Sequence, residues 1–181
     1  VLGLAYVSRE QLAAWPAVAL GFVAASLIVH FGLFALSAAF WRSRGVRVHE
    51  PFVAPHRATS LREFWSRRWN RPFSELMRIA IYAPLVRRTG RPVALLAGFL
   101  FSGLLHELAI SVPVRAGYGL PTLYFLMHGV AVLAEERLER TGSMPVGALG
   151  RLWCAAWLIA PLPLVFHAQF RAEVVAPLVG L

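Results

Sequence analysis

Apolar residues in this sequence fall into four long runs separated by polar or proline-bearing segments. The second run, residues 92–114, has about the length that a helix needs to cross the hydrocarbon core of a bilayer, roughly 20 residues. The last run is interrupted by Pro161 and Pro163. We therefore predict an all-α fold, a polytopic membrane helix bundle with about four transmembrane helices. The four runs cover residues 15–40, 92–114, 120–134 and 152–166.

Polar and charged residues dominate the segment 42–91, which holds twelve of the eighteen arginines. Because positively charged loops of membrane proteins face the cytoplasm, we place this segment on the cytoplasmic side. Ser60 followed by Glu63 has the spacing of a capping box and predicts a helix start. A second short helix is predicted over residues 73–86, after an interruption at residues 70–72. Both helices are too short and too charged to span, so we predict one or two interfacial helices on this side.

The composition supports an integral membrane protein, since 58% of the 181 residues are hydrophobic and the mean hydropathy is +0.61. All basic residues are arginine and all acidic residues are glutamate. The absence of aspartate excludes a Ser-His-Asp triad, and the absence of lysine excludes Schiff-base chemistry. The net charge of +9 favours a membrane surface or an anionic substrate over nucleic acid. The single cysteine, Cys154, excludes an intramolecular disulfide.

The sequence begins at Val1 without methionine, and residues 1–6 resemble the end of an earlier apolar segment. We therefore expect the chain to be truncated at its N-terminus. No basic region and no small-residue cleavage site precede the first apolar run, so no signal peptide is expected. We predict a single membrane domain over residues 1–181.

Two ionisable neighbours, His106 and Glu107, lie deep inside the second apolar run. Ionisable side chains inside a membrane helix are costly, on the order of 3 kcal/mol, and so mark candidate functional sites. Ser102 lies one turn earlier on the same helix face. Gly98 and Gly103 are small enough to let another backbone approach closely. His106 suits a general base, although it could instead only hydrogen-bond a neighbouring helix.

His106 and Glu107 begin a sequence that resembles a zinc-protease motif, but Ile110 occupies the position of the second histidine ligand. No metal site is therefore predicted. Glu107 is expected to orient the helix or the imidazole rather than to react.

Aromatic residues and arginines alternate in the string that ends at Asn70. Trp65 and Trp69 could anchor an interfacial helix at headgroup depth. Alternatively, Arg67 and Arg68 hold a phosphorylated substrate, and Asn70 reaches the site as a hydrogen-bond donor. Both interpretations remain open from the residues alone.

A hairpin that turns near Gly117 would place His106 and His128 at similar depth, each about eleven residues from the turn. His128 is then either a core histidine beside Gly129 or a second side chain near the substrate. His30 is interpreted as structural. The charged run 135–140 is interpreted as a solvated helix end.

Taken together, three motifs of this sequence resemble the wax synthase branch of the membrane-bound O-acyltransferase superfamily. They are the string from Phe64 to Asn70, the Ser-Gly-Leu-Leu-His-Glu motif that ends at Glu107, and the pair His128-Gly129. The resemblance spans residues 55–177, which we take as the acyltransferase-like core. It implies transfer of an acyl group from acyl-CoA to a hydroxyl group. Members of the family usually have more membrane helices, which implies that this chain is the C-terminal, catalytic part.

The resemblance implies His106 and Asn70 as catalytic residues, with Glu107 in support. No cofactor is expected, because acyl-CoA is a co-substrate; the acceptor is a lipid or an alcohol, for example a long-chain alcohol that yields a wax ester. Membrane lipids are expected partners, nucleic acid is not, and the oligomeric state stays open. We expect the bacterial inner membrane as the location. The expected substrate-binding residues are Trp65, Arg67, Arg68, Trp69, Ser102 and His128.

Two other functions remain compatible with the sequence. In the first, His30, His106 and His128 on separate helices supply axial ligands to a haem in a membrane cytochrome. In the second, the chain is a non-catalytic membrane subunit whose basic segment binds anionic lipid.

Overall fold

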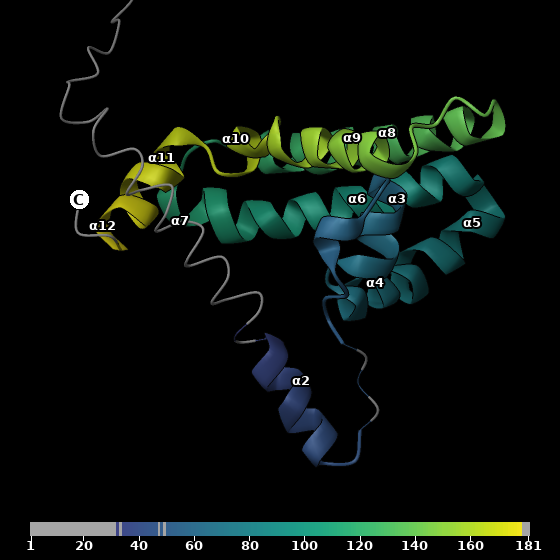
Figure 1. Ribbon diagram of the computed structural model, residues 1–181. Helices are drawn as coiled ribbons and strands as arrows, with labels where there is room; N and C mark the ends of the chain where they lie inside the picture. The colour runs from purple at the N-terminus through teal and green to yellow at the C-terminus, as the bar shows by residue number, and fades with distance from the viewer. Residues whose placement is uncertain (1–31, 33, 47, 49, 179–181) are drawn as a thin grey trace, which may run out of the picture.

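The computed structural model describes residues 32, 34–46, 48 and 50–178 (Figure 1). This part of the chain consists of helices and turns, without a strand, as the sequence predicted. His30 and most of the first apolar run lie outside the described residues. The end of that run forms α2 (Phe34–Ser43).

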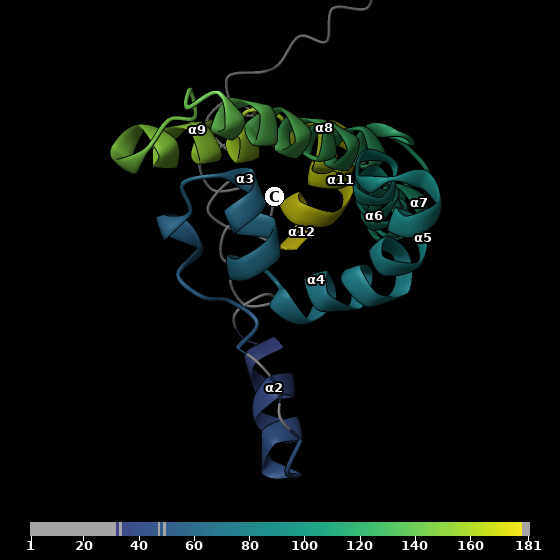
Figure 2. The ribbon, with the colours of Figure 1, turned by 90° about the vertical axis from the view of Figure 1, so that its right-hand side faces the viewer.

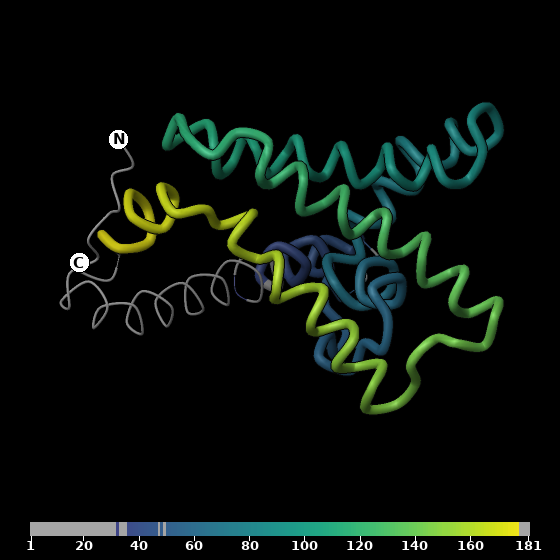
Figure 3. The backbone as a smooth tube through the Cα atoms, turned by 90° about the horizontal axis from the view of Figure 1, so that it is seen from above, coloured from purple at the N-terminus to yellow at the C-terminus, as the bar shows by residue number. Residues whose placement is uncertain are grey.

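The central apolar run forms one continuous helix, α6 (Arg91–His106), η5 (Glu107–Ser111) and α7 (Val112–Val114). η5 is a π-helical turn that begins directly after His106. The predicted hairpin is confirmed, because α8 (Leu120–Arg140) returns along α6 after a short turn. From above, α8 leaves the end of α7 and diverges from α6 along its length (Figure 3).

Glycines allow the close contact between α6 and α8. A Cβ on Gly103 would lie 2.7 Å from the Cα of Thr122, a distance that real side chains do not reach. A Cβ on Gly129 would lie 2.9 Å from the side chain of Leu96. The predicted packing role is thus confirmed for Gly103, whereas a Cβ on Gly98 would meet nothing within 4 Å.

Two described helices are long and apolar enough to cross a membrane, Arg91–Val114 and Gly147–Val165. The latter comprises α9 (Gly147–Ile159) and α10 (Leu162–Val165), which lie before and after the proline break at Pro161. Among the described residues, four transmembrane helices are therefore not confirmed. The chain closes with three short elements. They are α11 (Ala168–Phe170), η6 (Arg171–Val175) and α12 (Ala176–Leu178).

The arginine-rich segment forms two helical pieces, of which the first packs against α8 and the second against α6; both lie below α8 in the view of Figure 2. After η2 (Pro55–Arg57) come α3 (Leu61–Glu63) and the π-helical η3 (Phe64–Arg68). A second helix follows as α4 (Arg71–Met77), η4 (Arg78–Tyr82) and α5 (Ala83–Thr89). Both predicted helices are confirmed, and the second begins two residues earlier than expected.

The predicted cap at Ser60 is confirmed, with one difference. Ser60 Oγ accepts a hydrogen bond from the N–H of Glu63. The carboxylate of Glu63, however, accepts from the N–H and the hydroxyl of Thr59 rather than from the N–H of Ser60. The aromatic residues that follow pack inward: Phe64 is buried, and Trp69 stacks on its ring at 5.4 Å between centroids.

The interpretation of residues 135–140 as a solvated helix end is wrong for Glu135, whose side chain is completely buried. Its carboxylate accepts hydrogen bonds from the N–H of Leu61 at 2.7 Å and of Arg62 at 2.9 Å. A third bond comes from Nε1 of Trp153 at 2.9 Å. One carboxylate on α8 therefore fixes both the start of α3 and the helix α9.

Replacing Glu135 with alanine should lower the free energy of unfolding by about 3 kcal/mol, because one buried and two partly buried N–H donors lose their acceptor. Unfolding in detergent, followed by circular dichroism, measures this loss. Glu139 on the same helix is the matched control, since it bonds Arg62 at the surface and its removal should cost less than about 1 kcal/mol. Equal losses for the two variants would contradict the assigned role of Glu135.

Candidate active site

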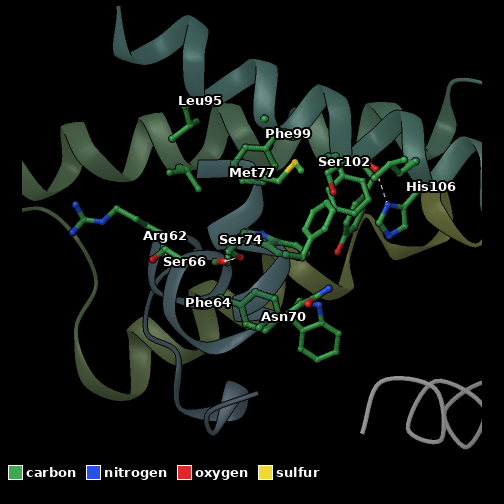
Figure 4. Close-up of a pocket in the computed structure, with 18 of the residues that line it drawn as sticks. Arg62, Phe64, Ser66, Asn70, Ser74, Met77, Leu95, Phe99, Ser102 and His106 are labelled. Atoms are coloured by element: carbon green, nitrogen blue, oxygen red, sulfur yellow. Dashed lines mark hydrogen bonds between the residues drawn. The ribbon is translucent and has the colours of Figure 1, made fainter. Parts of the chain in front are cut away.

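A cavity of about 1060 Å³ lies among the helices α3, α4, α6, α8 and α9–α10 (Figure 4). Most of its walls are apolar, with aromatic rings such as Trp65 and Phe99. Polar side chains reach it at a few points, among them Asn70, Ser102 and His106. A largely apolar cavity with a small set of convergent polar groups is typical of a binding or active site.

His106 is the last residue of α6 and lines this cavity. Its Nδ1 lies 2.7 Å from the carbonyl oxygen of Ser102, one turn earlier (Figure 4). A carbonyl oxygen can only accept, so in the neutral imidazole Nδ1 carries the proton and Nε2 carries the lone pair. The ring also packs on Phe125 with centroids 4.2 Å apart. The fold thus fixes both the tautomer and the orientation of His106.

Glu107 follows His106 in sequence but does not line the cavity. Its Oε1 accepts hydrogen bonds from the N–H of Gly119 and from both the N–H and the hydroxyl of Thr122. These donors belong to the first turn of α8, where a carboxylate is favourable. Glu107 therefore holds the start of α8 against α6, in the orienting role that the sequence predicted.

Asn70 lines the same cavity from the facing wall, between Trp69 and the start of α4 (Figure 4). Its backbone is left-handed, with φ 43° and ψ 55°, a conformation that asparagine tolerates better than most residues. Hydrogen bonds from Arg71 N to Pro51 O and from Ser74 N to Asn70 O hold the backbone on both sides. Within the described residues, no hydrogen bond occupies the side-chain amide.

Three other predicted substrate-binding residues also lie on the cavity wall: Trp65, Trp69 and Ser102. Trp65 is held by a hydrogen bond from the Ser74 hydroxyl to its carbonyl, at 2.5 Å. Ser102 contributes its side chain to the wall and its carbonyl to His106.

Arg67 and Arg68 do not line the cavity. Arg68 bonds the carboxylate of Glu63 and the carbonyls of Val53 and Ala54, so it joins the segment before α3 to the helix. Burial opposes ionisation of Glu63, but hydrogen bonds from Thr59 and Arg68 outweigh it and hold the pKa of Glu63 below its ordinary value. Arg67 is exposed and borders only a small polar hollow.

Four arginines that the sequence interpretation missed do line the cavity. Three of them pair with a glutamate, and Arg71 has no side-chain partner among the described residues. The helical spacing of Arg71, Ser74 and Arg78 places them on one face of the second helix, a signal that the sequence already contained. The four are Arg62, Arg71, Arg78 and Arg91.

His128 lies behind the cavity wall rather than on it. It is completely buried, its Nε2 donates to the carbonyl oxygen of Trp157 at 2.9 Å, and its ring packs on Tyr124 and Trp65. This geometry is that of a core histidine that joins α8 to α9. The structure therefore does not bring His128 to the predicted substrate contact.

Neither a haem nor a metal ion receives support from this arrangement. The described residues contain no group of three or more metal-ligating side chains. Of the three histidines considered as haem ligands, His30 is outside the described residues, and His106 and His128 each bond a backbone carbonyl.

Residues 48–127 match the membrane bound O-acyl transferase family. The chain is 33% identical over 137 residues to probable long-chain-alcohol O-fatty-acyltransferase 2 of Arabidopsis thaliana, covering 69% of this chain and 40% of that protein. It is 33% identical over 138 residues to the long-chain-alcohol O-fatty-acyltransferase of Simmondsia chinensis, covering 65% of this chain and 39% of that protein. The chain thus spans about 40% of the length of these relatives. No solved structure matches the chain.

Proposed function

We propose that the chain, whose residues 48–127 match the membrane bound O-acyl transferase family, carries the site at which a fatty acyl group passes from acyl-CoA to the hydroxyl of a long-chain alcohol. The observation that carries this proposal is the placement of His106 and Asn70 on facing walls of one cavity. The relatives named above supply the acceptor class by their names alone.

In this mechanism, Nε2 of His106 removes the hydroxyl proton as the alcohol oxygen attacks the thioester carbonyl. The carbonyl oxygen becomes an oxyanion, to which the Asn70 amide donates a hydrogen bond. The tetrahedral intermediate then collapses with cleavage of the C–S bond. The thiolate of CoA takes the proton from the His106 imidazolium, and the ester and free CoA leave. No covalent acyl-enzyme and no cofactor is needed.

The arginines on the cavity wall supply the positive charge that the phosphates of acyl-CoA require. Arg71 can bind a phosphate without breaking an ion pair, because no carboxylate among the described residues neutralises it, whereas Arg78 and Arg91 would have to exchange a glutamate for the phosphate; a guanidinium suits phosphate geometry in either case. This assignment replaces Arg67 and Arg68, which lie away from the cavity.

The orientation in the membrane is part of the proposal. The concentration of arginines predicts that the segment 42–91 lies on the cytoplasmic side. In this proposal the hydrophilic phosphates of acyl-CoA approach the cavity from the same side. The relatives named above are plant proteins, which gives no support to the expected bacterial inner membrane.

The chain in liposomes should form ester from a long-chain acyl-CoA and a long-chain alcohol, with one free thiol released per ester. Thiol release is followed with a chromogenic disulfide, and the ester is quantified by mass spectrometry. Omission of the alcohol is the control and should abolish both products. Thiol release without ester would indicate a hydrolase and would overturn the proposed function.

A further inference from the structure

The close packing that explains Gly103 and Gly129 within the helices of the hairpin does not explain Gly98. Glycine in a helix interior costs about 0.5–1 kcal/mol relative to alanine. At Gly103 only glycine fits, because the backbone of α8 is too close for a Cβ. At Gly98 a Cβ would meet no atom within 4 Å. Gly98 instead faces the cavity. The missing side chain therefore leaves space inside the cavity and not between helices.

Gly98 belongs to a row of small residues that leads to His106. Ala94, Gly98, Ser102 and His106 follow at intervals of four residues, and all four line the cavity. Residues at this spacing lie on one helix face. On a helix that rises about 1.5 Å per residue, Gly98 lies roughly 12 Å from His106. The row thus forms a low floor along the approach to the imidazole.

Arginines line the other end of this floor, where Arg91 pairs with Glu136 and Arg78 with Glu75. Arg91 begins α6 and lines the cavity, together with Arg78 of the facing helix. Arg91 lies roughly 22 Å along the helix from His106, given the same rise per residue. A phosphate that exchanges with these glutamates at Arg91 and Arg78, and a reacting carbonyl at His106, would be connected by a slender chain that passes Gly98.

We propose that Gly98 makes room for the pantetheine arm of acyl-CoA, between phosphates held at the cavity arginines and the thioester at His106. This inference rests on the proposed acyl-CoA donor. It assigns Gly98 to donor binding and not to the recognition of either hydrocarbon chain, because the floor lies between the charged end and the reacting group. The Ser102 hydroxyl, one turn closer to His106, is available to an amide of the arm.

The test compares CoA with adenosine 3′,5′-bisphosphate, which has the charged head without the arm. A leucine in place of Gly98 should weaken the binding of CoA at least tenfold, as measured by calorimetry on the full chain in detergent. The same variant should bind the bisphosphate as well as the unmodified protein does. Gly98→Ala should give a smaller loss in the same direction. Ala109→Leu, an exposed position of the same helix outside the cavity wall, is the matched control and should bind both ligands normally.

Equal binding of CoA by Gly98→Leu and by the unmodified protein would overturn the inference, and so would an equal loss for both ligands. In turnover, the KM for acyl-CoA should rise by the same factor at every acyl length. A loss confined to long acyl chains or to long alcohols would also overturn it, because a hydrocarbon chain would then lie along the row. A protein that binds CoA but forms no ester would reject the proposed function and leave the binding test valid.

Discussion

Replacing His106 with glutamine should lower kcat for ester formation by about 10²–10⁴-fold, the usual contribution of a general base. Glutamine has a similar volume and can still bond the Ser102 carbonyl, but it has no lone pair of comparable basicity to replace Nε2. The KM for acyl-CoA should stay within a few-fold, because the phosphates and the arm bind elsewhere. Initial rates at saturating alcohol, with acyl-CoA varied, separate the two constants.

His56 provides the matched control for this substitution. It is exposed on η2 and does not line the cavity, so His56→Gln should retain full turnover. A thermal unfolding curve for each variant excludes loss of folded protein as the cause. Unchanged turnover in His106→Gln would show that the reaction does not need this imidazole as a general base and would contradict the mechanism.

Replacing Asn70 with glycine should lower kcat by about 10²–10³-fold, the effect found for removal of one oxyanion donor. Glycine is the informative choice, because it adopts the left-handed backbone of this position without strain. The variant therefore removes the amide and keeps the conformation. Turnover and the unfolding temperature, measured on the same preparation, should show a large loss of the first and little change in the second.

Asn70→Asp tests the chemistry of the amide more narrowly. Aspartate keeps the shape of the side chain, but its carboxylate offers no N–H donor and repels an oxyanion. It should lose at least as much turnover as the glycine variant. Full activity in Asn70→Asp would show that no donated hydrogen bond from this residue is used.

Local spacing in the sequence was enough to predict much of the fold and the placement of the two candidate catalytic residues. The interval of four residues placed Ser102 and His106 on one helix face, and their hydrogen bond follows from it. The lengths of the two apolar runs around Gly117 gave the hairpin. The sequence predicted an interruption between the two short helices at residues 70–72, and in the structure Asn70 has a left-handed backbone at that point.

Contacts between distant segments explain what the sequence interpretation missed. Arg68 was expected at the substrate, but the π-helical winding of η3 brings it to Glu63 and to the carbonyls of the preceding segment. Glu135 looked like a solvated residue after an apolar run, and only the packing of α3 over α8 buries it. The backbone partners of Glu135 are 74 and 73 residues away in sequence, so no local pattern could identify them, whereas Glu63 is only five residues before Arg68 and was missed because an α-helix does not bring residues at that spacing together.

A double-mutant cycle on kcat/KM tests most directly whether His106 and Asn70 act on one thioester. Groups in contact or in one network show coupled effects, whereas a base and an oxyanion donor can each contribute when the other is absent. The cycle is therefore combined with CoA binding, and we predict that each single variant loses at least about 10²-fold in kcat, that the double variant is slower than either, and that all three bind CoA within a few-fold of the unmodified protein. An unchanged kcat in either single variant, or a loss of CoA binding as large as the loss of turnover, would contradict the account.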